Sequence, residues 1–326
     1  MGHDAPDQTK CRIAAWLGEA LCGSVGTPLS ESRIDLAAVA GAGPESASFA
    51  EAHGLEYLAD PRALLQLAVD TVLIADPTLD IGSESLAALI REASHKGTRI
   101  CTLTPRPASY SEAGDLLQAG PLPRPIPLTR DVAEGRGLLD ALDSFGRIDS
   151  VQLELDTTRP HGTCLDRIYD AFDLLHGLLG THRSVHAAEP IRPSTPSGES
   201  TRNITIIARH VDGQVAGISA SDGGGRFSRS LTAWGEGGRL HWRNGRVDWI
   251  DPDGKPVEQD DQSPAMSPEF PEQLVEAVVR ISMAPSPTQT EPRQVETLAC
   301  VEASLLALRT GETESVDRIR SVLDRL

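Results

Sequence analysis

The chain has 326 residues, of which 39% are hydrophobic and 24% are charged, and its formal net charge is −17. This length is enough for two domains or one large one, and the composition is ordinary for a globular protein. The negative charge disfavours binding to nucleic acids and to anionic membranes, and no apolar run approaches the ~20 residues that a membrane span needs. We therefore expect neither nucleic acid nor membrane as a partner.

The first ten residues are polar and acidic and lack the apolar segment of a secretory signal, so residues 1–10 are expected to form a disordered tail. The five cysteines are scattered and include no CxxC pair, which indicates neither a zinc ribbon nor a disulfide framework. Reduced thiols in a cytoplasmic protein are the simplest interpretation. Cys164 is expected to be a small packing residue rather than a nucleophile.

Apolar strands alternate with helical segments in the first part of the chain, which predicts a parallel sheet covered by helices on both faces. Proline and glycine are frequent in 104–128, so this segment is expected to be a hinge without regular structure. The predicted strands cover 11–17, 34–40, 71–75 and 99–103, and the clearest helices cover 44–53 and 83–96.

An incomplete glycine-rich motif follows the first strand. Gly18, Ala20 and Gly23 form G-x-A-x-x-G, where a dinucleotide site has G-x-G-x-x-G. The Ala20 methyl group crowds the place of a pyrophosphate, and the charge of Glu19 repels phosphates. The second strand leads into Gly41 without the carboxylate that would bind a ribose. These departures predict that binding of NAD or NADP is weak or lost.

The second part of the chain has strand-like runs joined by short turns, including an Asn244-Gly245 hairpin signal, and ends in three amphipathic helices near 271–281, 293–309 and 313–325. The fold class is therefore α/β: a Rossmann-like nucleotide-binding domain over 11–128, followed by an α+β domain over 129–326 with a mainly antiparallel open sheet. Helices on one face of that sheet leave the other open, and apolar outer residues near 204–208 and 214–219 would favour a homodimer or homotetramer.

One helix, over 162–180, carries the most suggestive polar pattern. Asp166, Asp170 and Asp173 lie at steps of four and three, on one face opposite an apolar stripe, and Tyr169 flanks them. Neighbouring carboxylates disfavour one another's ionised form when they are partly buried. The face is either a solvated acidic surface or part of a site.

Several segments together resemble the glucose–fructose oxidoreductase / inositol dehydrogenase / MocA (Gfo/Idh/MocA) family. This resemblance implies a nicotinamide-dependent oxidoreductase acting on a sugar-like or polyol-like small molecule, with Asp76 and Pro77 beside the cofactor. It is carried by ASFAEAHGLEY at 47–57, TVLIADP at 71–77, FGRIDSV at 145–151, the helix at 162–180, and TAWGEGGRL at 232–240.

The departures from the family fall at its chemical positions. The lysine that follows the family's fifth strand is replaced by Thr104. In the family's D-x-x-x-H-x-x-D helix motif, Asp166 and Asp173 match but Asp170 replaces the catalytic histidine. The resemblance thus implies that the fold is kept while the usual catalytic pair is lost.

Two functions remain open from the sequence. The first is a pseudoenzyme, a family relative with little or no dehydrogenase turnover and a binding or scaffold role. The alternative is an active NAD(P)-dependent oxidoreductase in which Asp166, Asp170 and Tyr169 serve as acid and base and Asp173 orients them. A divalent cation on the aspartate stripe is a weaker idea, because one helix offers too few ligands, and no metal is predicted.

Overall fold

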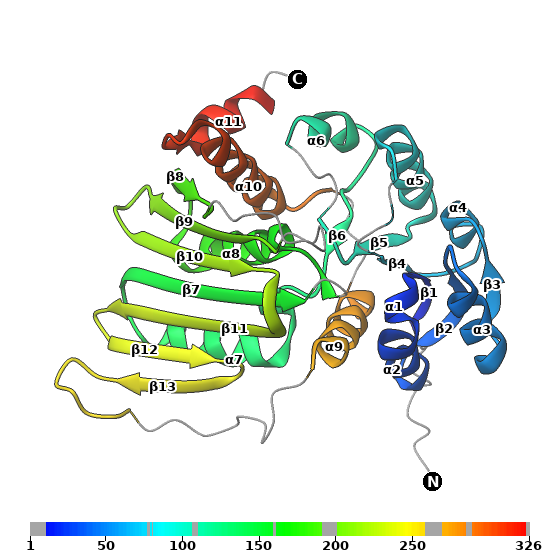
Figure 1. Ribbon diagram of the computed structural model, residues 1–326, viewed down its shortest axis with the longest axis horizontal. Helices are drawn as coiled ribbons and strands as arrows, with labels where there is room; N and C mark the ends of the chain where they lie inside the picture. The colour runs from blue at the N-terminus through cyan, green and yellow to red at the C-terminus, as the bar shows by residue number, and fades with distance from the viewer. Residues whose placement is uncertain are drawn as a thin grey trace, which may run out of the picture.

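The computed structural model describes residues 11–76, 79, 81–105, 110–158, 161–190, 201–257, 269–284 and 289–323. The chain folds around two sheets, a parallel one near the N-terminus and a larger one in the second part (Figure 1). The tail expected at 1–10, Pro77, and large parts of the loops expected at 187–201 and 251–268 lie outside the described residues. Within the described part of the chain, no helix has the length and apolar character needed to cross a bilayer.

The first sheet has six parallel strands in the order β3-β2-β1-β4-β5-β6. Its central strands are buried along nearly their whole length, as expected when helices cover both faces of a parallel sheet. The Rossmann-like fold predicted from the alternating pattern is therefore confirmed. The strands are β1 (Arg12–Leu17), β2 (Asp35–Ala40), β3 (Glu56–Leu58), β4 (Thr71–Ala75), β5 (Arg99–Thr102) and β6 (Arg124–Pro125).

The two helices predicted most clearly, α3 and α5, are present with the expected bounds. Each ends at a glycine with positive φ, 65° at Gly54 and 69° at Gly97, the conformation in which glycine closes a helix without strain. The helices of this part are α1 (Glu19–Leu21), the π-helical turn η1 (Cys22–Gly26), α2 (Thr27–Glu31), α3 (Pro44–His53), α4 (Pro61–Leu64), α5 (Ser83–Lys96) and α6 (Tyr110–Leu117).

The expectation that 104–128 has no regular structure is wrong, because this segment contains α6 and β6. Ala113 and Leu116 lie three residues apart and are buried, so an apolar helical stripe holds α6 beside α5. Pro125 is compatible with β6 because β6 is an edge strand, where one missing backbone donor is tolerated.

The second sheet has eight strands in the order β13-β12-β11-β7-β10-β9-β8-β14. All neighbours are antiparallel except β7 and β10, which confirms the predicted mainly antiparallel sheet. Asn244 and Gly245 have φ values of 46° and 90° and connect β12 to β13 as the predicted two-residue hairpin. The strands are β7 (Ile148–Thr158), β8 (His182–Ala188), β9 (Asn203–His210), β10 (Val215–Ser221), β11 (Gly223–Gly235), β12 (Gly238–Arg243), β13 (Arg246–Ile250) and β14 (Glu314–Ser315).

Helices cover one face of this sheet, and α8 lies behind it in Figure 1. Helix α9 sits between the two halves of the molecule, where it contacts both η1 and η2. The predicted helix at 162–180 is α8, with Thr163 as its N-cap and Gly180 after its last turn. The helical elements are the 3₁₀ turn η2 (Thr129–Asp131), α7 (Ala133–Asp143), α8 (Cys164–Leu179), α9 (Phe270–Met283), α10 (Pro292–Thr310) and α11 (Val316–Leu323).

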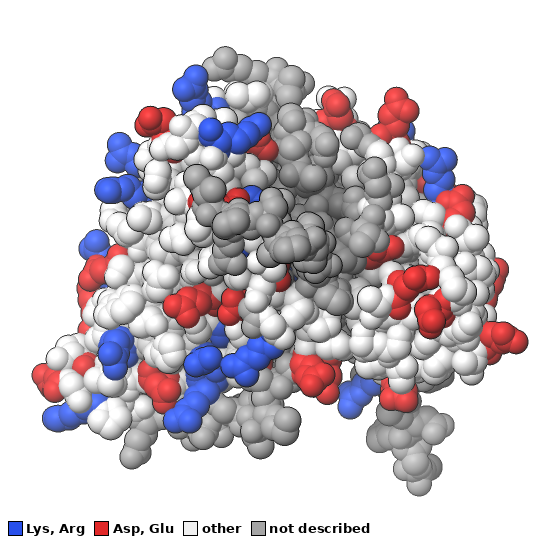
Figure 2. Space-filling view, in the orientation of Figure 1, with Lys and Arg blue, Asp and Glu red and all other residues white. Residues whose placement is uncertain are grey.

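The open face of the second sheet is mixed rather than apolar. In β9, Ile204 and Ile206 are buried and face the helices. Of the apolar residues that we expected on the outer face of this strand, only Ile207 is exposed. Ile207, Val215 and Trp234 are exposed by 48%, 37% and 41%, among polar neighbours. Figure 2 shows acidic and basic side chains interspersed over this half, whereas acidic side chains prevail over the nucleotide-fold half.

All five cysteines are free thiols, and four of them are buried. Cys164 donates a hydrogen bond from Sγ to the Ala220 carbonyl at 3.2 Å, and burial raises the pKa of its thiol to about 12. A thiol that stays protonated is a poor nucleophile. Cys164 is therefore a packing residue of α8.

Candidate functional site

The carboxyl ends of β1, β2 and β4 form the edge at which a sheet of this type binds a dinucleotide. Gly18 follows β1 and donates a backbone hydrogen bond to the Ala75 carbonyl at 2.9 Å. The Asp76 side chain lies beside Gly18, where an added Cβ would approach its carboxyl group to 3.1 Å, and it accepts a hydrogen bond from Trp16 Nε1 at 3.1 Å. The structure thus brings Gly18 and Asp76 together.

Glu19 crosses from the loop after β1 to the loop after β2. A Cβ added to Gly43 would lie 1.6 Å from Glu19 Oε1, so the carboxylate rests on the backbone of Gly43. Beside it, the Tyr57 hydroxyl donates to the Gly41 carbonyl at 2.9 Å. Glu19 therefore places both volume and negative charge between the two loops that would hold the ribose and the pyrophosphate of a dinucleotide.

The other two residues of the incomplete glycine-rich motif are Ala20 on α1 and Gly23 on η1, and both are exposed. A Cβ added to Gly23 would meet no atom within 4 Å. The obstruction in this crevice is consequently the Glu19 carboxylate rather than the packing around Gly23.

The three carboxylates of α8 are buried, so they do not form a solvated acidic surface. Asp166 is 3% exposed and takes part in a capping box, in which it accepts from the backbone N–H of Thr163 while Thr163 Oγ1 accepts from the N–H of Asp166. This reciprocal arrangement satisfies two donors at the start of the helix. Asp166 thus fixes where α8 begins.

Asp170, which the sequence resemblance aligns with a catalytic histidine, is completely buried. Its carboxylate accepts hydrogen bonds from Thr129 N at 2.6 Å, Thr129 Oγ1 at 3.0 Å and Arg229 Nε at 3.0 Å. Arg229 also donates to Gln273 Oε1 at 2.7 Å and to the Pro127 carbonyl at 3.0 Å. Asp170 is therefore the centre of a network that joins α8, η2, β11 and α9.

Asp173 lies between two guanidinium groups. Arg130 Nε is 2.8 Å from Oδ2, and Arg293 Nε is 3.1 Å from Oδ1. Burial outweighs these cations and raises the pKa of the Asp173 carboxyl to about 6, while the neighbouring Asp170 adds a smaller effect. Arg130 also pairs with Glu291 at 3.0 Å, so these contacts connect α8 with η2 and α10.

Tyr169 and Thr104 are the remaining residues that the sequence places at the site. Tyr169 is 2% exposed, and burial together with the charge of Asp173 raises the pKa of its phenol well above 10, so the group stays protonated. Thr104 follows β5 and is half-buried; its Oγ1 has no hydrogen-bond partner among the described residues. Asp170 accepts from Thr129, not from Thr104.

Two arginines at this centre were not anticipated from the sequence. Arg167 is 3.9 Å from Asp170 Oδ2 and lies 4.9 Å from the centre of the Phe227 ring, which Arg229 also contacts at 4.7 Å. Burial lowers the pKa of Arg167 to about 10. The sequence does contain a signal for Arg229: it lies two residues before the buried Leu231 in β11, and residues two apart on a strand point to the same face.

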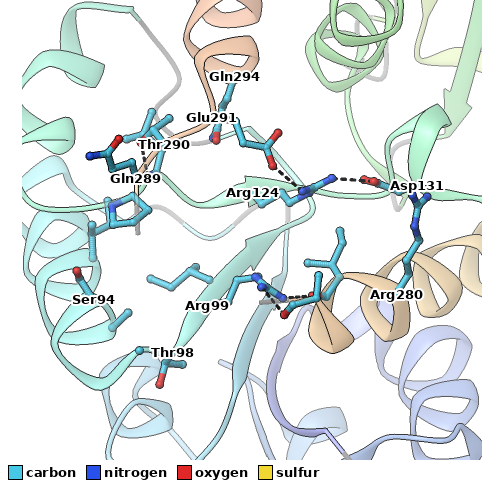
Figure 3. A pocket seen from close by; sticks show the side chains of 18 residues that line it. Ser94, Thr98, Arg99, Arg124, Asp131, Arg280, Gln289, Thr290, Glu291 and Gln294 are labelled. Atoms are coloured by element: carbon cyan, nitrogen blue, oxygen red, sulfur yellow. Dashed lines mark hydrogen bonds and ion pairs between the residues drawn. The ribbon is translucent and has the colours of Figure 1, made fainter. Parts of the chain in front are cut away.

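A cavity of about 390 Å³ lies elsewhere, at the amino end of β5, between α5, α9 and α10 (Figure 3). Arg99 donates from both terminal nitrogens to main-chain carbonyls at the end of α9. Arg124 pairs with Asp131 at 2.8 Å and with Glu291 at 2.9 Å. These guanidinium groups hold α9 and α10 in place, and the cavity faces away from the carboxyl edge where nucleotides bind.

No protein-family model and no curated protein matches the chain. Solved structures do match it over nearly the whole length of both chains. An oxidoreductase from Agrobacterium radiobacter in complex with NAD⁺, L-tartaric acid and magnesium is 16% identical, with a TM-score of 0.72, and the match covers 95% of this chain and 100% of that one.

Two further structures show the same likeness. Levoglucosan dehydrogenase in complex with NADH and L-sorbose is 14% identical, with a TM-score of 0.71 and coverage of 94% and 99%. A myo-inositol dehydrogenase from Corynebacterium glutamicum is 16% identical, with a TM-score of 0.65 and coverage of 94% and 98%. These likenesses confirm the fold that the sequence resemblance implies: the chain has the fold of the Gfo/Idh/MocA oxidoreductases.

Proposed function

We propose that this chain is a divergent Gfo/Idh/MocA-type cytoplasmic protein with little or no dehydrogenase turnover, which acts through binding or as a scaffold. The observation that carries the proposal is the state of Asp170. It occupies the position of the family's catalytic histidine, is completely buried, and accepts hydrogen bonds from Thr129 and Arg229.

Hydride transfer to or from an alcohol needs a group that moves the hydroxyl proton, and a positive charge helps to stabilise the developing alkoxide. Thr104 supplies neither. Asp170 is directed at structural partners on two other elements, η2 and β11, and Tyr169 is a buried phenol whose raised pKa keeps it protonated. Loss of a general acid or base typically lowers the rate by ~10²–10⁴-fold.

The nucleotide crevice supports the same proposal. The Glu19 carboxylate rests on Gly43, between the two loops that would hold a dinucleotide. The half of the molecule that contains the nucleotide fold is also predominantly acidic on the face shown in Figure 2, and this disfavours an anionic ligand. We therefore expect NAD and NADP to bind weakly or not at all.

One observation favours the alternative, an active oxidoreductase. The pKa of Asp173 is raised to about 6, which is suitable for a base near neutral pH. Its two oxygens, however, each face a guanidinium group at 2.8 and 3.1 Å, so a substrate would have to displace Arg130 or Arg293. These ion pairs favour a structural role for Asp173 over a role as catalytic base.

The direct test is turnover of the purified chain with inositols and common sugars, using NAD⁺ and NADP⁺. We expect no activity above background in the wild type. The Thr104→Lys, Asp170→His variant should stay inactive unless Glu19 and Ala20 are also changed to glycine. Robust wild-type turnover would refute the proposal; its loss in an Asp170→Asn variant that retains the wild-type Tm would identify Asp170 as the base.

The partner that we propose is a second copy of the chain, docked on the open sheet face through Ile207, Val215 and Trp234. Light scattering at micromolar concentration should give a dimer or tetramer mass, and Ile207→Glu with Trp234→Glu should give the monomer. Val322→Glu is the matched control, because Val322 is 55% exposed on α11, outside this sheet face. A monomeric wild type would contradict self-association.

A further inference from the structure

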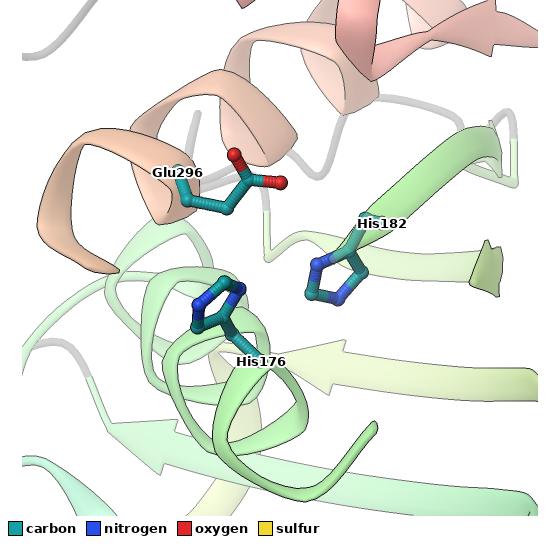
Figure 4. A group of neighbouring side chains, drawn as sticks. All are labelled: His176, His182 and Glu296. Atoms are coloured by element: carbon teal, nitrogen blue, oxygen red, sulfur yellow. The ribbon is translucent and has the colours of Figure 1, made fainter. Parts of the chain in front are cut away.

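A second polar cluster lies at the other end of α8. His176 is in the last turn of α8, His182 begins β8, and Glu296 is on α10. Ligand atoms of these three side chains all lie within 4.8 Å of one another. Figure 4 shows the two imidazole rings and the carboxylate converging from the three elements toward one point.

The polar atoms of this cluster are short of partners. His182 is completely buried, and neither of its ring nitrogens has a hydrogen-bond partner among the described residues. The same holds for His176 Nδ1 and Glu296 Oε1. Buried polar atoms are nearly always satisfied in folded proteins, so unpartnered atoms on three side chains whose ligand atoms lie within 4.8 Å of one another call for a ligand.

Packing alone does not account for a histidine at position 182. Its ring lies edge-on to Phe172, with the centroids 5.2 Å apart, and tilted against His210 at 4.2 Å. A phenyl ring would make the same contacts without burying two nitrogens. The contacts of the ring with Phe172 and His210 therefore do not explain why it carries nitrogens.

We propose that His176, His182 and Glu296 bind a divalent transition-metal ion, with zinc as the favoured occupant. Two imidazoles and one carboxylate form a common zinc ligand set, whereas Mg²⁺ and Ca²⁺ prefer oxygen ligands alone. Tetrahedral ligands about 2.1 Å from zinc lie ~3.4 Å from one another. The three side chains therefore need only small rotations to close around the ion.

The surroundings suit this ion. Zinc needs neutral imidazole, and the burial of His182 in the fold disfavours a charged ring. Arg320 Nη1 donates to Glu296 Oε2 at 2.8 Å, which orients the carboxylate and leaves Oε1 directed at the histidines. A water molecule can complete the tetrahedron.

The three ligands belong to elements that are distant in the chain but adjacent in the fold, since α10 packs against both α8 and β8. An ion held by them would cross-link these elements on the helix-covered face of the second sheet. Metal binding to a site that exists only in the folded state raises the stability of that state. The bound ion would thus stabilise the folded chain at a site separate from the nucleotide crevice.

The experiment uses the full chain, freed of metal by a chelator and then titrated with Zn²⁺ in competition with a chromophoric indicator. We expect a single zinc ion per chain, bound in the micromolar range or tighter, and a higher Tm on addition of Zn²⁺. Co²⁺ in its place should show the visible absorption of a tetrahedral complex. A wild type that binds no stoichiometric Zn²⁺ overturns the proposal.

Variants separate this site from adventitious binding. His182→Phe keeps the ring contacts, and His176→Gln changes a half-exposed residue, so both should fold; each should weaken zinc binding more than ~100-fold, because even outer-shell changes cost about 10–100-fold. His186→Gln, on the same strand but outside the cluster, should bind zinc like the wild type. Unchanged affinity in His182→Phe and His176→Gln would also overturn the proposal.

Discussion

The two ends of α8 differ in how their polar side chains are satisfied. Ahead of the last turn, Asp170 and Asp173 are buried and each lies against guanidinium groups: Asp170 accepts hydrogen bonds from Thr129 and Arg229, and Asp173 forms ion pairs with Arg130 and Arg293. At the far end, His176 and His182 are turned toward Glu296 with ring nitrogens that lack partners among the described residues. The aspartates of the helix motif thus have cationic partners, whereas ring nitrogens without partners among the described residues lie at the end of the same helix.

The largest expected effect is a loss of stability when the contact between Arg229 and Asp170 is removed. Arg229→Met removes the guanidinium group that is hydrogen-bonded to the buried Asp170 carboxylate and leaves only Arg167, at 3.9 Å, as its cation. Removal of one partner of a buried pair lowers the free energy of unfolding by about 3–5 kcal/mol. Chemical denaturation measures this loss. Arg246→Met, which breaks an exposed pair with Asp248, is the control and should change stability by less than about 1 kcal/mol.

The double variant Arg229→Met, Asp170→Leu sharpens this prediction. It removes both charges, so it should be more stable than Arg229→Met alone. If Arg229→Met destabilises no more than Arg246→Met, the Asp170 network does not support the fold and the comparison between the two ends of α8 fails.

The next effect is on NAD⁺ affinity at the nucleotide crevice, where we expect the Glu19 carboxylate to exclude the ligand. Glu19→Gly with Ala20→Gly removes the charge and opens the loop, so NAD⁺ affinity should rise about tenfold, or ~1.4 kcal/mol. Calorimetry measures the change. Glu31→Gln, on α2, is the charge-matched control and should leave the affinity as it is.

A smaller effect is expected where Asp166 caps α8. Thr163→Ala removes the side-chain oxygen that accepts from the Asp166 N–H, and loss of such a cap lowers the free energy of unfolding by about 1 kcal/mol. Thermal denaturation is sufficient to measure it. Thr163→Ser keeps the oxygen and should behave like the wild type; equal losses in both variants would show that the cap is not the cause.

The smallest effect on stability is expected at His182, beside the last turn of α8. In metal-free protein, His182→Phe replaces two unpartnered nitrogens by carbon in a ring of similar shape, so stability should change by less than about 1 kcal/mol or increase. Denaturation in the presence of a chelator measures this. A loss as large as that of Arg229→Met would mean that His182 has partners in the folded chain and that the two ends of α8 are alike.

Much of the fold follows from local sequence patterns. The alternation of buried strands with helices and the Asn244-Gly245 turn are each determined by a few neighbouring residues, and the structure has them as predicted. Helix α6 and strand β6 were missed because the prolines around them outweighed a short apolar stripe and because an edge strand tolerates proline.

The site could be predicted only in part, because its partners come from distant segments. The sequence places Asp166, Asp170 and Asp173 on one face of α8, but it does not show that Arg229 reaches Asp170 from β11 or that Arg293 reaches Asp173 from α10. The histidine cluster has no local spacing motif, since its carboxylate comes from α10. Burial and pairing, which decide the role of each group, are properties of the tertiary structure.

The central claim is that the catalytic and cofactor positions have become part of the scaffold. Titration of the purified wild-type chain with NADH and NADPH, followed by nicotinamide fluorescence and calorimetry, tests this claim most directly. The account predicts dissociation constants well above the micromolar range for both cofactors. A saturable complex in the micromolar range or tighter, or a dinucleotide that copurifies with the chain, would contradict it.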